Sequence, residues 1–303
     1  MSQPTHLEKG SRIGIVATAR KIAMAELQPA VDVLNSWGLE VVLGKNLFES
    51  SNQFSGTDVQ RAADLQQMLD DVTISAVIIA RGGYGTVRII DRIDFTLFQQ
   101  YPKWIIGYSD ITVLHSHIHQ LTGISTLHAT MPINFMSQVN NGEALTTLQQ
   151  TLFGKRLSHV FDPQPLNKTG EANGVLIGGN LSVLYSLLGS VSFPDTDGKI
   201  LFLEDLDEYL YHIDRMMTGL KRAGVMSNLA ALVVGGMSNM KDNTISFGET
   251  HEDIILNIVK EYNYPVCFGF PAGHIINNRA LKMGAKYHII VGENCLLIES
   301  NED

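Results

Sequence analysis

The segment WIIGYSD, residues 104–110, places a serine directly behind an apolar run. The run has strand character and ends at Gly107, and apolar residues at helical spacing follow over 110–121. Ser109 at the apex of a strand–turn–helix matches the logic of a nucleophile elbow, because the turn lifts its hydroxyl to where a base can reach it. The free N–H groups where the helix begins, near Asp110, can stabilise an oxyanion. The pattern departs from G-x-S-x-G, and a serine that only caps the helix remains an open alternative.

A serine nucleophile needs a general base, and the base needs a group that orients it. Among the ten histidines, His274 lies in the segment FGFPAGH that leaves a predicted short strand at 265–268. Loops at strand ends often carry functional residues, although a structural role for this histidine remains open. Glu204 follows directly on the predicted apolar strand 199–203, whereas the acids behind it are typical of a solvated turn. We therefore expect Glu204 to point into a cleft.

A metal site must also be weighed, because His115 and His119 are four residues apart on one predicted helix, with His117 between them. No H-E-x-x-H pattern and no nearby carboxylate cluster accompany them. A solvated or partly buried helix face is the favoured interpretation. We expect no metal and no other cofactor.

The segment RGGYG, residues 81–85, lacks both the G-x-G-x-x-G spacing and the lysine of a P-loop. Such a glycine turn can expose backbone N–H groups to an anion. It can also be a tight turn that needs positive φ angles, and the two interpretations are compatible.

The composition excludes several classes of partner. A net charge of −9 over 303 residues argues against nucleic acid or an anionic membrane as the main partner. The first residues show no secretory signal, and no apolar run approaches the roughly 18 residues of a membrane span. Cys267 and Cys295 have no metal-type spacing and are expected to be buried and reduced. These features favour a cytoplasmic protein.

Apolar segments with helices between them indicate the fold class. We expect strands at 12–17, 40–43, 74–80 and 104–107, and helices at 23–37, 57–71 and 110–121. This alternation predicts an α/β domain with a doubly wound parallel sheet. Ligands bind outside the carboxyl ends of such strands, where both 81–85 and 107–110 fall, so the two segments can face one cleft.

The amino-acid composition changes near residues 154–170. This stretch contains Pro, Gly and polar residues, and it is interpreted as a linker. We therefore place an N-terminal domain at 1–155 and a C-terminal domain at 168–303. Beyond the linker the pattern predicts a mixed α/β domain. Its strands are expected at 199–203, 230–234, around Val266, 287–291 and 295–298, and its helices at 211–223 and 249–262.

Taken together, these segments resemble the LD-carboxypeptidase family, serine peptidase family S66. The resemblance spans nearly the whole chain. Its motifs are GSRIGIVA (10–17), ARGGYG (80–85), IGYSDIT (106–112), GGNL (178–181), LED (203–205), IDRM (213–216) and GH (273–274). The chain order Ser–Glu–His is more specific than any single motif.

The resemblance implies roles for the three residues: Ser109 as nucleophile, Glu204 as the residue that orients the imidazole, and His274 as general base and acid. It also implies a Rossmann-like (flavodoxin-like) N-terminal domain, a C-terminal domain that holds Glu204 and His274, a homodimer and no metal. The chain departs from the family at Thr18-Ala19, at 128–132 and at 278–284. None of these departures touches the trio, so they bear on substrate detail.

The implied reaction is hydrolysis of the bond between the L-centre of a diamino acid and the terminal D-Ala of a murein tetrapeptide. Backbone N–H groups of Gly83 and Asp110 are the candidates for holding the oxyanion. A carboxypeptidase also needs a cation for the product-side carboxylate. Arg81 and Arg215 are both candidates, and the sequence does not choose between them.

Two other functions remain. The same trio in an immunity-type hydrolase of a peptidyl-nucleotide antibiotic would need an aromatic-bearing loop for the base. The chain has only Trp37 and Trp104, and no tryptophan-bearing insertion lies between Asp110 and Glu204. The murein peptidase is therefore favoured. A non-catalytic two-domain binder of small molecules would also have a cleft, but would normally carry an export signal.

Overall fold

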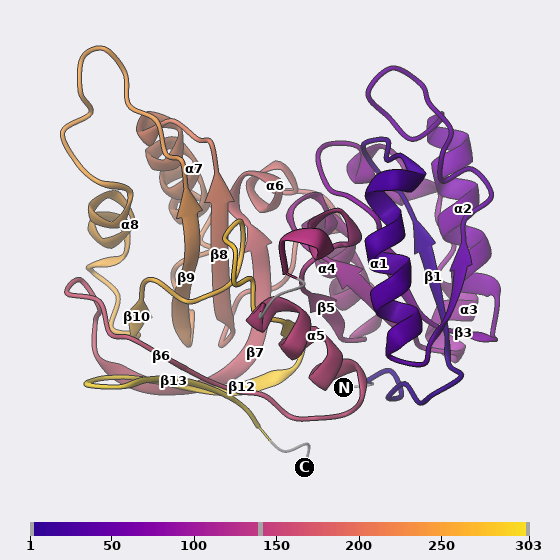
Figure 1. The fold of residues 1–303 in the computed structure, drawn as a ribbon. Helices are drawn as coiled ribbons and strands as arrows, with labels where there is room; N and C mark the ends of the chain where they lie inside the picture. The colour runs from indigo at the N-terminus through magenta and orange to yellow at the C-terminus, as the bar shows by residue number, and fades with distance from the viewer. Residues whose placement is uncertain (1–2, 139–141, 301–303) are drawn as a thin grey trace.

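The first sheet carries the flavodoxin-like strand order expected of a doubly wound domain. The computed structural model describes residues 3–138 and 142–300. Parallel strands run in the order β2-β1-β3-β4-β5 (Figure 1). Their bounds are β1 Arg12–Val16, β2 Glu40–Leu43, β3 Ile74–Ile79, β4 Trp104–Gly107 and β5 Thr126–His128. The predicted α/β class is confirmed.

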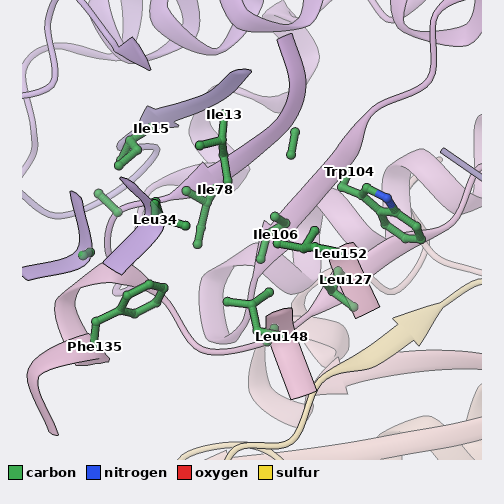
Figure 2. Close-up of a cluster of buried hydrophobic side chains, with 14 of the residues drawn as sticks. Ile13, Ile15, Leu34, Ile78, Trp104, Ile106, Leu127, Phe135, Leu148 and Leu152 are labelled. Carbon is green, nitrogen blue, oxygen red and sulfur yellow. The ribbon is translucent and has the colours of Figure 1, made fainter. Parts of the chain in front are cut away.

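Helices cover both faces of this sheet: α1 Met24–Ser36, α2 Asp58–Asp70, α3 Thr96–Gln100, α4 Thr112–Thr122 and α5 Glu143–Leu152. Alternate strand side chains point to opposite faces. Ile13, Ile15, Ile78 and Ile106 pack with Leu34 of α1 and with Leu148 and Leu152 of α5 (Figure 2). The residues between them on the strands pack with α2, α3 and α4. Burial on both faces explains why these strands are continuous apolar runs.

The second sheet is mixed, in the order β10-β9-β8-β7-β12-β13-β6. The strands from β10 to β7 are parallel, and β12, β13 and β6 continue the sheet antiparallel. Their bounds are β6 Ser158–Phe161, β7 Gly170–Asn180, β8 Ile200–Leu206, β9 Ala231–Ser238, β10 Val266–Cys267, β12 Lys286–Val291 and β13 Cys295–Glu299. The helices of this half are α6 Leu181–Ser186, α7 Leu210–Arg222 and α8 His251–Val259. The expected second mixed α/β part is therefore present.

Two features of the chain differ from the expected organisation. The stretch 154–170 is more than a linker, because Ser158–Phe161 forms the edge strand β6. Its alternating buried and exposed residues make a four-residue strand that the surrounding Pro and Gly obscured. In addition, β11 (Leu281–Met283) leaves the second half and pairs antiparallel with β5 of the first sheet. A three-residue strand carries too little pattern to be predicted.

Helix α4, which follows Ser109, lies between the two sheets (Figure 1). Its first residue, Thr112, accepts a hydrogen bond through Oγ1 from the backbone N–H of Asn180, at 2.9 Å. A Cβ at Gly179 would lie 2.5 Å from the same oxygen, and Gly179 has a φ of +135°. Only glycine allows this approach, which fixes the start of α4 against the end of β7. No helix of the described residues is long and apolar enough to cross a bilayer.

Candidate active site

Ser109 stands at a strained turn between β4 and α4. Its φ is +65°, a left-handed conformation that a non-glycine residue adopts rarely. A short 3-10 turn, Ser109–Ile111, precedes α4, so the helix proper begins at Thr112 and not near Asp110. A Cβ at Gly107 would lie 2.7 Å from Ile111 Cγ1, so glycine is needed where the strand ends. This sharp turn is the elbow geometry that presents a serine hydroxyl.

Glu204 and His274 form a directly bonded pair. The imidazole Nδ1 lies 2.6 Å from Glu204 Oε2, which also accepts the backbone N–H of His274 at 3.1 Å. The Glu204 side chain is fully buried and that of His274 is 14% exposed. Gly273 has a φ of +107°, and a Cβ there would lie 2.7 Å from Glu204 Cβ. Glycine at position 273 therefore allows the loop to pack closely against the Glu204 carboxylate. Because Nδ1 is bonded to Glu204, the Nε2 atom of His274 is available to another partner.

An open cavity of about 500 Å³ brings these segments together. Its lining includes Ser109, His274 and the glycine loop 81–84, together with Tyr108, Met131, Ile133, Asn134, Leu206 and Asp207. The expected contact between His274 and Glu204 is present. Among the hydrogen bonds of the described residues, none joins Ser109 Oγ to the imidazole. Such contacts are often loose in a ligand-free site and tighten with substrate.

The environment of His274 sets its protonation. Burial lowers the pKa of the imidazole, but the charge and hydrogen bond of Glu204, with smaller contributions from Asp205 and Asp207, outweigh burial and leave the pKa raised. The ring of Tyr108 packs on His274 with centroids 4.8 Å apart. Burial raises the pKa of Tyr108 to about 12, so its hydroxyl stays neutral beside the pair.

The glycine loop is tied to the serine turn through Asp110. The Asp110 carboxyl accepts the backbone N–H of Thr86 at 2.8 Å and the Thr86 hydroxyl at 2.6 Å, and the N–H of Gly85 also reaches it. A Cβ at Gly82 would lie 3.4 Å from Ser109 Oγ, so the loop passes beside the serine hydroxyl. Gly83, with a φ of +124°, donates its N–H to no described acceptor. A backbone N–H without a protein acceptor in such a glycine loop is available to an anion.

The arginines differ in whether they line the cavity at Ser109. Arg81 lines the cavity, as its place behind β3 predicts. Arg215 does not: it is exposed on α7 with its guanidinium 5.1 Å from the centre of the Tyr211 ring. Of the two arginines that the sequence proposed for the carboxylate, Arg81 is among the residues that line this cavity and Arg215 is not. Arg20, which the sequence analysis missed, lines the cavity instead.

Two of the histidines of α4 have structural partners. His115 is buried and bonds Thr126 Oγ1 at 2.8 Å and Gly107 O at 3.0 Å, and His117 bonds Ser192 Oγ at 2.8 Å. These two are core residues, whereas His119 is partly buried, as the sequence favoured for this helix face. Within residues 3–138 and 142–300, no three side chains of His, Cys, Asp or Glu converge in the manner of a metal site.

A second carboxylate beside Glu204 was not recognised from the sequence. Asp205 accepts Asn180 Nδ2 at 2.9 Å and Ser182 N at 2.8 Å. Burial, followed by the charge of Glu204, raises the pKa of Asp205 to about 6. The Asp205 side chain thus holds the turn at 178–181 and the start of α6 by two hydrogen bonds. The signal available in the sequence was the polar Asn180 at the end of an apolar strand.

Comparisons with known proteins show the family and the fold. Profiles described as the LD-carboxypeptidase N-terminal and C-terminal domains match residues 13–129 and 173–289. A Bacillus subtilis protein named "Probable murein peptide carboxypeptidase" is 36% identical, over 98% of this chain and 94% of its own. The muramoyltetrapeptide carboxypeptidase structure from Oxalobacter formigenes has a TM-score of 0.87 at 27% identity, covering 96% of this chain and 100% of its own.

A further relative acts in immunity. The Escherichia coli "Microcin C7 self-immunity protein MccF" is 26% identical over 86% of this chain and 83% of its own.

Proposed function

This chain belongs to the LD-carboxypeptidase family, serine peptidase family S66, and on that premise we propose that it is a serine carboxypeptidase that releases terminal D-Ala from murein tetrapeptides. The observation that carries the proposal is the 2.6 Å contact of the buried Glu204 with His274, whose side chain lines the same cavity as the strained Ser109. We also propose that the protein acts in the cytoplasm as a homodimer, with domains at 1–155 and 168–303.

In the proposed reaction, His274 Nε2 takes the proton of the Ser109 hydroxyl while the serine oxygen attacks the carbonyl carbon of the L-centre. Glu204 holds the imidazole by Nδ1 and stabilises the imidazolium that forms. When the tetrahedral intermediate collapses, His274 protonates the nitrogen of D-Ala and the peptide bond breaks. Water, deprotonated by the same imidazole, then attacks the acyl-enzyme and regenerates Ser109.

The negative charge of the intermediate needs donors already in place. The N–H groups of Gly83 and Asp110 are the proposed pair, because the loop that carries Gly83 passes beside Ser109 and Asp110 follows it. The Asp110 side chain holds the loop through Thr86, so the two donors belong to one bonded unit. Such preorganised donors do not have to reorient as charge develops.

Incubation with a defined murein tetrapeptide, followed by measurement of free D-Ala, tests the proposed function. Turnover with release of one D-Ala per tripeptide is the expected result. An aspartyl- or glutamyl-sulfamoyl nucleoside serves as the competing substrate. Hydrolysis of that compound without turnover of the tetrapeptide would assign the protein to the immunity-type reaction, and turnover of neither, with no labelling of Ser109 by a serine-directed phosphonate, would leave a binding protein.

Chelation provides an independent prediction about the nucleophile. We expect D-Ala release to survive EDTA, because the serine hydroxyl and imidazole supply nucleophile and base without a Lewis acid. The measurement is the rate before and after chelation and dialysis. A loss of activity that zinc restores would contradict the serine mechanism.

The pH profile should report the raised pKa of His274. The imidazole must be neutral to accept the serine proton, so kcat/KM should rise with pH and reach half its plateau above pH 6.5, the ordinary value for histidine. In Glu204→Gln the carboxylate charge is gone and burial remains, which lowers the pKa. The acid limb of that variant should therefore move to lower pH. An unmoved limb would mean that another group controls the rate.

A further inference from the structure

The cavity at Ser109 has two arginines, and both lie on the wall formed by the glycine loop. Arg81 begins this loop, and Arg20 comes from the segment behind β1. A Cβ at Gly83 would lie 2.7 Å from Arg20 Cγ and Cδ and 2.9 Å from its Nε. Because Gly83 has no side chain, the aliphatic part of the Arg20 side chain has space to pass across the loop at this position. This contact places Arg20 beside the N–H proposed for the oxyanion.

The two guanidinium groups differ in their surroundings. Arg81 Nη1 lies 3.7 Å from Glu26 Oε1 and 3.5 Å from the carbonyl oxygen of Lys21, so its charge is partly used by α1 and the segment before it. For Arg20, no carboxylate of the described residues lies within 4.0 Å of the guanidinium. A cation without an anionic partner in an open cavity is available for an anionic ligand.

The lining of the cavity also includes a carboxylate. Asp207 lines it from the end of β8, with a left-handed φ of +61°. Its carboxylate is 58% exposed and lies 3.4 Å from Lys241 Nζ. A substrate carboxylate would be repelled by Asp207 and attracted by Arg20, and this difference favours one orientation of the bound peptide.

We propose that Arg20 binds the terminal α-carboxylate of the leaving residue and so restricts the enzyme to peptides that end in a free carboxylate. This inference rests on the proposed function. Three bonds, a path of about 4 Å, separate the attacked carbonyl carbon from the carboxylate carbon of a terminal residue. With the carbonyl at Ser109 and its oxygen at Gly83, that carboxylate falls on the wall that Arg20 crosses. A guanidinium can bind it through two parallel hydrogen bonds.

A matched pair of tetrapeptides tests the assignment, one ending in D-Ala and the other in D-Ala amide. The wild type should prefer the acid. Arg20→Gln should lower kcat/KM for the acid by about 10- to 100-fold, mostly through KM, and leave the amide nearly unchanged. Arg20→Lys should restore part of the preference. Arg92→Gln, at an exposed arginine outside the cavity, is the matched control and should keep the wild-type ratio.

Arg81→Gln separates the two candidate cations. A smaller loss of acid preference than in Arg20→Gln supports the inference, whereas a larger loss would overturn it and assign the carboxylate to Arg81. Equal losses on acid and amide in Arg20→Gln, with an unchanged thermal unfolding midpoint, would also overturn it.

A second readout does not depend on the murein substrate. Two serine-directed phosphonates, with and without a carboxylate on the leaving group, are compared by their rates of Ser109 labelling. If the wild type releases no D-Ala but labels faster with the carboxylate-bearing phosphonate, and Arg20→Gln removes this difference, the proposed substrate is wrong and Arg20 is still the anion ligand. Equal labelling rates in the wild type would reject Arg20 in either case.

Discussion

Replacing Ser109 with alanine should lower kcat by about 10⁴-fold or more, because the covalent route disappears and the remaining donors can only stabilise a direct attack by water. The Kd for the tetrapeptide should change little, since the hydroxyl is a small part of the cavity surface. Alanine also has a methyl in place of CH₂OH at a φ of +65°, so the backbone strain at the turn is kept. The measurements are kcat on one muropeptide and Kd by calorimetry.

The double variant Ser109→Ala/His274→Ala tests whether the residues act as a unit. Members of a triad lose activity non-additively, so the double variant should be about as slow as Ser109→Ala alone. A double variant slowed by the product of the two single losses would show that serine and histidine act independently. The proposed mechanism would then be wrong.

Glu204→Gln should lower kcat by about 10³-fold, less than the serine variant. Glutamine has the same shape and can still accept the hydrogen bond of His274 Nδ1, so the ring keeps its place. The negative charge that supports the imidazolium is lost, in a side chain that is fully buried. Rate constants at the pH plateau separate this loss from the shift of the acid limb.

The matched control for this variant is Glu208→Gln. Glu208 lies four residues further along, on the solvent side, where it bonds His212 Nδ1 at 2.5 Å, and it does not line the cavity. It is also a glutamate–histidine pair, so a loss of charge there alters the protein in the same way without touching His274. Equal kcat losses in the two variants would mean that Glu204 acts only through the stability of the fold.

The named relatives and the charges of the cavity together indicate which substrate to test first. The Bacillus subtilis relative and MccF are both similar in sequence to this chain, and their names point to different functions. A cavity whose lining includes both Arg20 and Asp207 suits a small substrate with charges of both signs. This charge pattern is the reason to begin with free-carboxylate peptides.

The sequence by itself determined the local parts of this protein. Continuous apolar runs predicted the strands of the first sheet, and the pattern over 57–71 predicted the helix that the structure has at Asp58–Asp70. Gly107 and Ser109 predicted a turn after β4. These features depend on steric contacts and hydrogen bonds between residues a few positions apart. Such local interactions can be predicted from the sequence itself.

Only the tertiary structure decided which distant residues meet. The Glu204–His274 bond joins residues 70 positions apart, and β11 returns to pair with a strand of the first half. The spacing of residues in the sequence could not show whether Arg81 or Arg215 lines the cavity, and it did not indicate Arg20. Which side chains line the cavity depends on the path of the backbone in three dimensions, and not on the neighbouring residues in the sequence. Contacts between residues so far apart in sequence form only when whole sheets and helices pack together. They therefore cannot be deduced from the composition of a short segment.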